Sequence, residues 1–301
     1  MKKIIAVVLV LMLIGSVFTV DWYIHKDYKL DEKTGVLTVS GMVDELLITH
    51  YLDNAHVKSI VAVEGCVLPE NCNMLFSGIT KKMPNLECID LSKADSSNVK
   101  IACNMFSNNE ELKTLILTGM DTSNITNMCG MFKDCSALEE LDLGGFDTSS
   151  VTTMAGMFMN CSSLKKLDLS GFNTANVIYM DDMFLGCKDL EIVDMSSFDT
   201  SKVESTECMF CDCSRLKIID LSSFETTKLK EMDQMFMFCT ALETIYVNSR
   251  WRTHKTNDKI FISCFRLVGG EGTKFDQDYQ DYLYAKIDQG ADDPGYFTLK
   301  E

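Results

Sequence analysis

The stretch Phe146-Asp-Thr-Ser-Ser-Val-Thr-Thr-Met-Ala-Gly-Met-Phe-Met-Asn-Cys-Ser-Ser-Leu-Lys-Lys-Leu-Asp-Leu-Ser-Gly-Phe172 decides the fold, because its pattern recurs every 26 residues. Its clearest mark is a Met-Phe pair, which begins at Met105, Met131, Met157, Met183, Met209 and Met235. A Cys follows three residues after each Phe, except in the first copy, where Asn109 takes its place. Self-similarity at a fixed period in the twenties indicates a solenoid, in which each copy buries its apolar side only against its neighbours.

Two periodicities within one copy predict the content of each coil. Apolar residues at i, i+3, i+4 and i+7 predict one face of a short helix, at Met154, Met157, Phe158 and Cys161. Leu167 and Leu169 alternate around Asp168, as in a strand, and the skeleton Leu164-x-x-Leu167-x-Leu169 fits the leucine-rich-repeat pattern. We therefore expect an α/β repeat fold, a leucine-rich-repeat solenoid with one short strand and one short helix per coil. Helices pack at about 8–10 Å and strands at about 4.8 Å, so the parallel sheet should be concave.

The period also predicts how the chain is divided. A pair of lysines and then an uncharged run to Val20 open the chain, which is typical of a signal peptide or an uncleaved anchor. The period is absent before Gly65, and Gly269-Gly270 break it near the other end. We expect a signal peptide or N-terminal membrane anchor at 1–20, an N-terminal β cap at 21–65, the leucine-rich-repeat array at 66–267 and a C-terminal cap at 268–301.

The charge and the motifs limit the classes of function. The net charge is −16, and removal of the two lysines in residues 1–20 would make it −18. Such a charge disfavours nucleic acid and anionic lipid as partners, so membrane contact is expected only through the N-terminal segment. The sequence has no nucleophile beside a base, no P-loop and no dinucleotide fingerprint. We expect no enzyme, no catalytic residue, no cofactor and no metal.

The 13 cysteines permit several interpretations. Six of them recur at one repeat position and are most simply buried free thiols: Cys135, Cys161, Cys187, Cys213, Cys239 and Cys264. Cys103 and Cys129 occupy equivalent positions in adjacent coils and would pair if the coil spacing allows. The run Cys208-x-x-Cys211-x-Cys213 invites a metal interpretation, but Cys213 already belongs to the recurring set and no His or second Cys pair lies nearby.

Aspartates recur between the two inward positions of the predicted strands, so they must point outward. Like charges stacked at strand spacing cost free energy. One explanation is a solvated face that keeps the array soluble, and the other is a recognition surface for a basic partner or for Ca²⁺. Ile116 and Tyr246 interrupt the series near its ends. The expected binding residues are Asp90, Asp142, Asp168, Asp194, Asp220, Ile116 and Tyr246.

The phrase from Phe146 to Phe172 closely resembles the repeat of BspA-like leucine-rich-repeat surface proteins of bacteria, and the resemblance extends over about residues 72–267. It implies an exported protein, at the cell surface or secreted, that binds a protein on a host cell, on another cell or in the extracellular matrix. The expected function is that of an adhesin acting through its concave sheet. The alternative is a structural surface-coat or self-associating protein without a specific host ligand.

Overall fold

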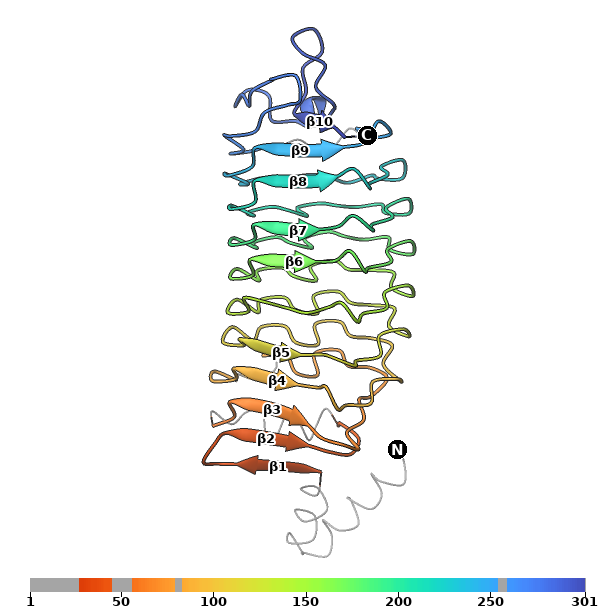
Figure 1. Cartoon of the computed structure of the whole chain (residues 1–301), viewed down its shortest axis with the longest axis vertical. Helices are drawn as coiled ribbons and strands as arrows, with labels where there is room; N and C mark the ends of the chain where they lie inside the picture. Colours follow the sequence, from red (N-terminus) through yellow and green to blue (C-terminus); the bar gives the residue numbers. More distant parts are fainter. Residues whose placement is uncertain (1–26, 45–55, 79–82, 254–258, 301) are drawn as a thin grey trace, which may run out of the picture.

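The structure is a computed structural model, and it describes residues 27–44, 56–78, 83–253 and 259–300. The segment predicted as signal peptide or anchor, residues 1–20, lies outside the described residues. Short strands stack one above another in a column of coils (Figure 1). The strands are β1 (Tyr28–Asp31), β2 (Val36–Val39), β3 (Ser59–Ala62), β4 (Cys88–Asp90), β5 (Thr114–Ile116), β6 (Lys166–Asp168), β7 (Ile192–Asp194), β8 (Ile218–Leu221), β9 (Thr244–Val247) and β10 (Phe297–Leu299).

The strands pair in parallel, apart from the antiparallel pair β1 and β2. Their hydrogen bonds define three sheets, with the orders β1-β2-β3-β4-β5, β6-β7 and β10-β9-β8. All of them lie on one side of the column, which we call the strand face (Figure 1). About half a period further along each coil, a second series of parallel bridges runs from Asn71 to Glu231, and we call that side the turn face. The parallel sheet predicted from the alternating leucines is therefore confirmed.

The prediction of a short helix in each coil is wrong. In the predicted segment, Met157 N donates to Met154 O at 3.1 Å and Cys161 N to Phe158 O at 3.0 Å, which are bonds of successive turns. The intervening amides bond to the next coil, as Phe158 N does to Met183 O at 2.9 Å. Residues with left-handed φ recur in the segment, among them Asn160 at 59°. In the described part of the chain, the one helical element is the 3₁₀ turn η1 (Tyr282–Tyr284).

The absence of helices removes the expected cause of a concave sheet. Curvature was predicted because helices on one side would need about twice the spacing of strands on the other. In the structure, backbone hydrogen bonds join neighbouring coils on the turn face as well, as in the bridge between Thr153 and Tyr179. Stacked Phe rings of successive coils have centroids 5.4 to 5.9 Å apart. Both sides of a coil therefore rise by similar amounts, and the coils form a column (Figure 1).

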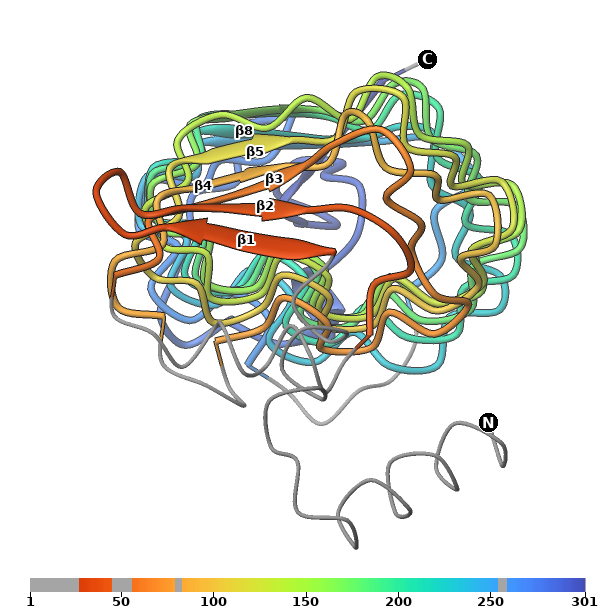
Figure 2. The same ribbon diagram turned by 90° about the horizontal axis from the view of Figure 1, so that it is seen from below.

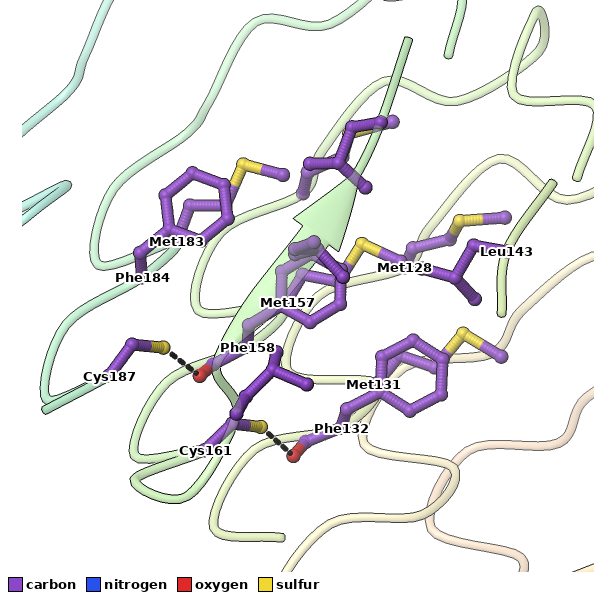
Figure 3. Close-up of a cluster of buried hydrophobic side chains, with 14 of the residues drawn as sticks. Met128, Met131, Phe132, Leu143, Met157, Phe158, Cys161, Met183, Phe184 and Cys187 are labelled. Atoms are coloured by element: carbon purple, nitrogen blue, oxygen red, sulfur yellow. Dashed lines mark hydrogen bonds between the residues drawn. The ribbon is translucent and has the colours of Figure 1, made fainter. Parts of the chain in front are cut away.

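The core fills the interior of the coils, which superpose when seen along the column (Figure 2). Met, Phe and Leu side chains of one repeat position lie against their equivalents in the next coil, as Met131, Met157 and Met183 do (Figure 3). Burial of each such side chain contributes about 1.5–3 kcal/mol, but only when a neighbouring coil covers it. The strict period of the sequence is therefore the direct cause of the stack.

Candidate binding face

The strand face carries the aspartates that the sequence predicts as a recognition surface. In β4, β5 and β6 the middle residue points into the core and its two neighbours point outward, as in β6, where Leu167 is buried between exposed residues. Asp168 lies directly beside Asp194 in the register of β6 and β7. Asp90 lies beside Ile116, and Asp220 beside Tyr246. We call these outward-facing aspartates, together with the exposed Asp142 of the coil between β5 and β6, the aspartate column.

The same aspartates also have a structural role. Each accepts, through Oδ1, a hydrogen bond from the backbone N–H two residues later, at 2.9 to 3.0 Å. In Asp168, the hydrogen bonds from the Ser170 hydroxyl and amide lower the pKa of the carboxyl group. Such side-chain-to-backbone bonds form the turn that ends a strand. In Asp90, Asp142, Asp168 and Asp194, one carboxylate oxygen therefore serves the turn, and the other is available to a partner.

The end of the column near β9 differs from the rest. Lys300 forms an ion pair with Asp220 and lies over the Tyr246 ring, 5.5 Å from its centroid. Burial raises the pKa of Asp220, but hydrogen bonds from Lys300 and Ser222 outweigh it, and the net effect lowers that pKa. The C-terminal lysine thus compensates one carboxylate of the column. For Asp142, Asp168 and Asp194, the described residues provide no ion-pair partner.

A groove between β7 and β8 is the feature of this face that sequence reasoning missed. Its volume is about 630 Å³, and it lies where β7 and β8 belong to different sheets. Ile192 and Ile218 are each 54% exposed and lie in its wall beside Val193. The signal was present in the sequence, because other coils place Thr114, Glu140, Lys166 or Thr244 at the position of these isoleucines. Two adjacent isoleucines at an outward position indicate an apolar contact surface.

Charged side chains border the groove. Glu and Lys alternate from coil to coil beside the strands, in the order Glu87, Lys113, Glu139, Lys165, Glu191, Lys217 and Glu243. Lys113 pairs with Glu87 at 3.3 Å, and Lys165 with Glu139 at 2.6 Å. No ion pair joins Glu191 to Lys217, although both side chains line the groove. Arg215 and Asp220 also line the groove, which therefore combines an apolar wall with two charges of each sign.

A group of carboxylates on the turn face was also missed. Oxygens of Asp181, Glu207 and Glu231 lie within 4.8 Å of one another, and Ser205 donates a hydrogen bond to Asp181. Burial and the neighbouring acids raise the pKa of Glu207. Oxygen ligands of this kind suit Ca²⁺. Exposed acidic groups also gather without an ion, so the grouping alone does not indicate a metal centre.

The recurring cysteines are buried free thiols, as the sequence predicted. Each donates a hydrogen bond to the carbonyl of the Phe one coil earlier, as Cys161 does to Phe132 O at 3.1 Å and Cys187 to Phe158 O at 3.1 Å (Figure 3). Burial raises the pKa of Cys187 to about 12. These thiols are therefore protonated and inert near neutral pH.

The run from Cys208 to Cys213 does not form a metal cluster among the residues that the structure describes. Cys213 belongs to the buried set and donates to Phe184 O at 3.2 Å. The Cys208 thiol donates a hydrogen bond to the Cys211 sulfur, which lowers the pKa of Cys211 and raises that of Cys208. Two thiols in one turn offer too few ligands for a structural zinc site.

Most of the repeat array is similar to a known protein family. A family model described as "Mycoplasma protein of unknown function, DUF285" matches residues 70–192, 141–251 and 164–282. The chain belongs to the DUF285 family. The DUF285 matches cover the array that carries the predicted resemblance to BspA-like leucine-rich-repeat proteins, and that prediction is confirmed. No curated protein matches the DUF285 chain.

Two solved structures are similar to the DUF285 chain. A leucine-rich cell surface protein of Faecalibacterium prausnitzii A2-165 is 16% identical over 76% of this chain and 56% of its own, with a TM-score of 0.43. A leucine-rich-repeat protein of Bacteroides ovatus is 17% identical over 80% of this chain and 79% of its own, with a TM-score of 0.42. The DUF285 chain thus spans just over half the length of the Faecalibacterium protein. The described residues include no helix that is long and apolar enough to span a bilayer.

Proposed function

We propose that this DUF285 chain is an exported cell-surface binding protein, an adhesin that recognises a protein on host cells or in the extracellular matrix through its strand face. The observation that carries the proposal is the groove of about 630 Å³ between β7 and β8. Ile192 and Ile218 are each 54% exposed there and lie at the same position of adjacent coils, so they form a continuous apolar surface. Export is supported by the lysine pair and the uncharged run of residues 1–20.

The groove has the composition of the centre of a protein–protein interface. Such centres combine an apolar seat with a polar rim, and a few buried apolar side chains carry most of the binding free energy. Here the seat is formed by Ile192, Val193 and Ile218, and Glu191 and Lys217 stand at the rim. A ligand segment that inserts one apolar side chain between two charged ones would fit this arrangement. The expected ligand is therefore a folded or extended protein segment, not a nucleic acid.

The aspartate column extends the same surface towards β6. Asp168 and Asp194 lie side by side, and each turn leaves one carboxylate oxygen for contact with a partner. A column of like charges attracts a basic partner and accelerates its association, and salt screens that attraction. We expect the groove to provide most of the affinity and the aspartates to provide its salt dependence.

Binding of the purified full-length chain to immobilised matrix proteins and to cultured host cells tests the proposal. The double variant Ile192→Lys with Ile218→Lys should weaken saturable binding by about tenfold or more, because it places two charges in the seat. The matched control is Tyr179→Lys, which changes a 47% exposed side chain on the turn face and should leave binding unchanged.

A second variant isolates the charge of the column. Asn in place of Asp142, Asp168 and Asp194 retains an oxygen that accepts the turn hydrogen bond but removes the charge. We expect weaker binding at low salt and a smaller change between low and high salt. Binding that survives in both variants would place the site elsewhere on the chain. No saturable binding by the unaltered chain would count against adhesion for the proteins and cells tested.

Self-association is the second candidate function, and exposed apolar side chains in residues 259–300 support it. Phe265 and Leu283 are 67% and 56% exposed. Phe265 contacts Phe275, which contacts Tyr296, at ring-centroid distances of 5.8 and 6.1 Å. Tyr296 is buried and Phe275 half-buried, so Phe265 is the exposed ring of this cluster, and an exposed apolar side chain on a rigid support suits an association surface. Sedimentation over a concentration series would show association that Phe265→Ser abolishes, whereas a monomer throughout the series would exclude this candidate.

A further inference from the structure

Cys103 and Cys129 form a thiol pair that differs from the buried cysteine set. Both are half-buried, whereas the six recurring thiols are fully buried. The two residues lie in adjacent coils, two positions beyond the parallel bridge between Ile101 and Asn127. The backbone continues in register past the bridge, because Asn104 N donates to Cys129 O at 2.8 Å. The same position in two stacked coils therefore places Cys103 beside Cys129.

The spacing of the coils suits a covalent link at this position. Facing residues of adjacent parallel strands are separated by about 4.8 Å, and disulfides join Cα atoms that are about 4.4–6.8 Å apart. The backbone register thus places the two residues within the range that a disulfide spans, without a shift of either coil. The buried thiols differ because each is directed at a backbone carbonyl, as Cys135 is at Phe106 O, 3.2 Å away.

The surroundings of the pair also differ from those of the buried set. Asn104 Nδ2 donates a hydrogen bond to Cys103 Sγ at 3.2 Å, which stabilises a negatively charged sulfur. Partial exposure lets a reagent reach either sulfur, and accessibility is one condition for thiol exchange. Burial and the nearby Cys129 raise the pKa of Cys103 to about 11, so exchange at that sulfur is slow near neutral pH and accelerates as the pH rises.

We propose that Cys103 and Cys129 form a disulfide that staples two adjacent coils, made by thiol–disulfide exchange with a small or protein disulfide. In the first step, one thiol loses its proton, its sulfur attacks the oxidant, a mixed disulfide forms and one thiolate leaves. In the second step, the other cysteine loses its proton and attacks the mixed disulfide at the sulfur of the chain, and the second thiolate leaves. Two electrons pass to the oxidant, and the two protons are taken up by its thiolates or by solvent.

A disulfide between Cys103 and Cys129 would stabilise the stack, because it joins two adjacent coils. A solenoid coil contacts only its neighbours, so coils separate from the ends inward. The disulfide would close a loop of one coil and prevent these two coils from separating. Oxidation would therefore protect the array from local opening on its N-terminal side, and reduction would remove that protection.

The sequence makes the link easy to detect. Trypsin cleaves after Lys100, Lys113 and Lys133, so Cys103 and Cys129 fall in peptides 101–113 and 114–133, each with a single cysteine. The experiment incubates the native full-length chain with oxidised glutathione, blocks the remaining thiols with N-ethylmaleimide, and maps the tryptic peptides by mass spectrometry. We expect the two peptides joined, with the loss of two hydrogens, and the six buried cysteines alkylated only after denaturation.

Variants show whether the link depends on this pair. Cys103→Ser and Cys129→Ser should each abolish the joined peptide, whereas Cys88→Ser should leave it unchanged, because Cys88 is half-buried without a thiol partner among the described residues. The map of the unaltered chain decides the question even if a variant fails to fold. Recovery of both cysteines as alkylated or glutathione-bound peptides, or linked to other cysteines, would overturn the proposal.

Discussion

A column of buried threonines joins each coil to the next, and its disruption should destabilise the array. Thr174 is fully buried, and its Oγ1 donates to Asp199 O at 2.9 Å and accepts from Asp199 N at 2.8 Å. One side chain thus satisfies a donor and an acceptor of the neighbouring coil. The equivalent residues make the same two bonds: Thr122, Thr148, Thr200 and Thr226.

The substitution Thr174→Val retains the shape of the side chain and removes the hydroxyl. It breaks two hydrogen bonds, each of which contributes about 0.5–1.5 kcal/mol, and it leaves two polar groups of Asp199 without that partner. A fully buried orphan group costs about 1–3 kcal/mol, but these bonds are only part-buried, so water can replace some of the loss. We therefore expect the free energy of unfolding to fall by about 2 kcal/mol.

Urea unfolding of the full-length chain, followed by circular dichroism in the presence of a reductant, measures the effect. The matched control is Thr152→Val, because the exposed Thr152 hydroxyl donates to Thr126 O at 3.0 Å and water can replace that bond. The control should change the free energy of unfolding by less than about 0.5 kcal/mol. If Thr174→Val were no more destabilising than Thr152→Val, the threonine column would not be what holds neighbouring coils together.

Three further predictions concern the polar groups of the array. The buried thiols have an ordinary pKa of 9.0, and burial raises the pKa of Cys135 to about 12. The thiols therefore contribute their full share to the free energy of unfolding below pH 9, and that share should be lost as the pH rises from 9 to 12. Thermal unfolding from pH 7.5 to 10.5 measures the decline, and Cys187→Ser should make it shallower. Asn109 donates to Phe76 O and Phe106 O, but its buried Oδ1 has no partner among the described residues. Asn109→Cys should therefore change the free energy of unfolding by less than about 1 kcal/mol, whereas Asn109→Asp, which buries a charge, should lower it by about 3 kcal/mol or more in urea unfolding. Asp168→Ala should lower the thermal midpoint more than Asp168→Asn, because Asn retains the oxygen that accepts the Ser170 amide; equal midpoints would exclude a structural role for that bond.

The repeat architecture was predictable from the sequence because the period is strict, whereas the local structure of one segment was not. Apolar residues at i, i+3, i+4 and i+7 suit a helix, but they also suit consecutive turns that bond from i to i+3. The residues between these apolar positions favoured the turns. Gly156 and Asn160 have φ values of 60° and 59°, and Gly and Asn adopt such values more readily than other residues. Gly, Asn or Asp occupies these two positions in most coils, which indicated turns instead of a helix.

The candidate site was predicted in part. The aspartate column follows from alternation alone, because a residue between two inward-facing residues of a strand must face outward. The groove does not follow from alternation, because it requires β7 and β8 to separate into different sheets while their coils remain stacked through Phe184 and Phe210, whose ring centroids are 5.4 Å apart. The role of Lys300 was also beyond prediction, since it pairs with Asp220 across 80 residues of sequence.

Within a coil, the inward residues hold the stack together and the outward residues of the strand do not, and this difference explains why binding is proposed for the strand face. The inward methionines and phenylalanines, the buried threonines and the buried cysteines all hold one coil against the next, so any coil that lost them would leave its neighbours uncovered. The outward position occupied by Ile192 carries no such constraint, and from Cys88 to Thr244 it holds Cys, Thr, Glu, Lys or Ile. A position that the fold leaves free can be occupied according to what a partner requires. Two adjacent isoleucines at that position, beside a groove and between opposite charges, are therefore better explained by a ligand than by the stability of the stack.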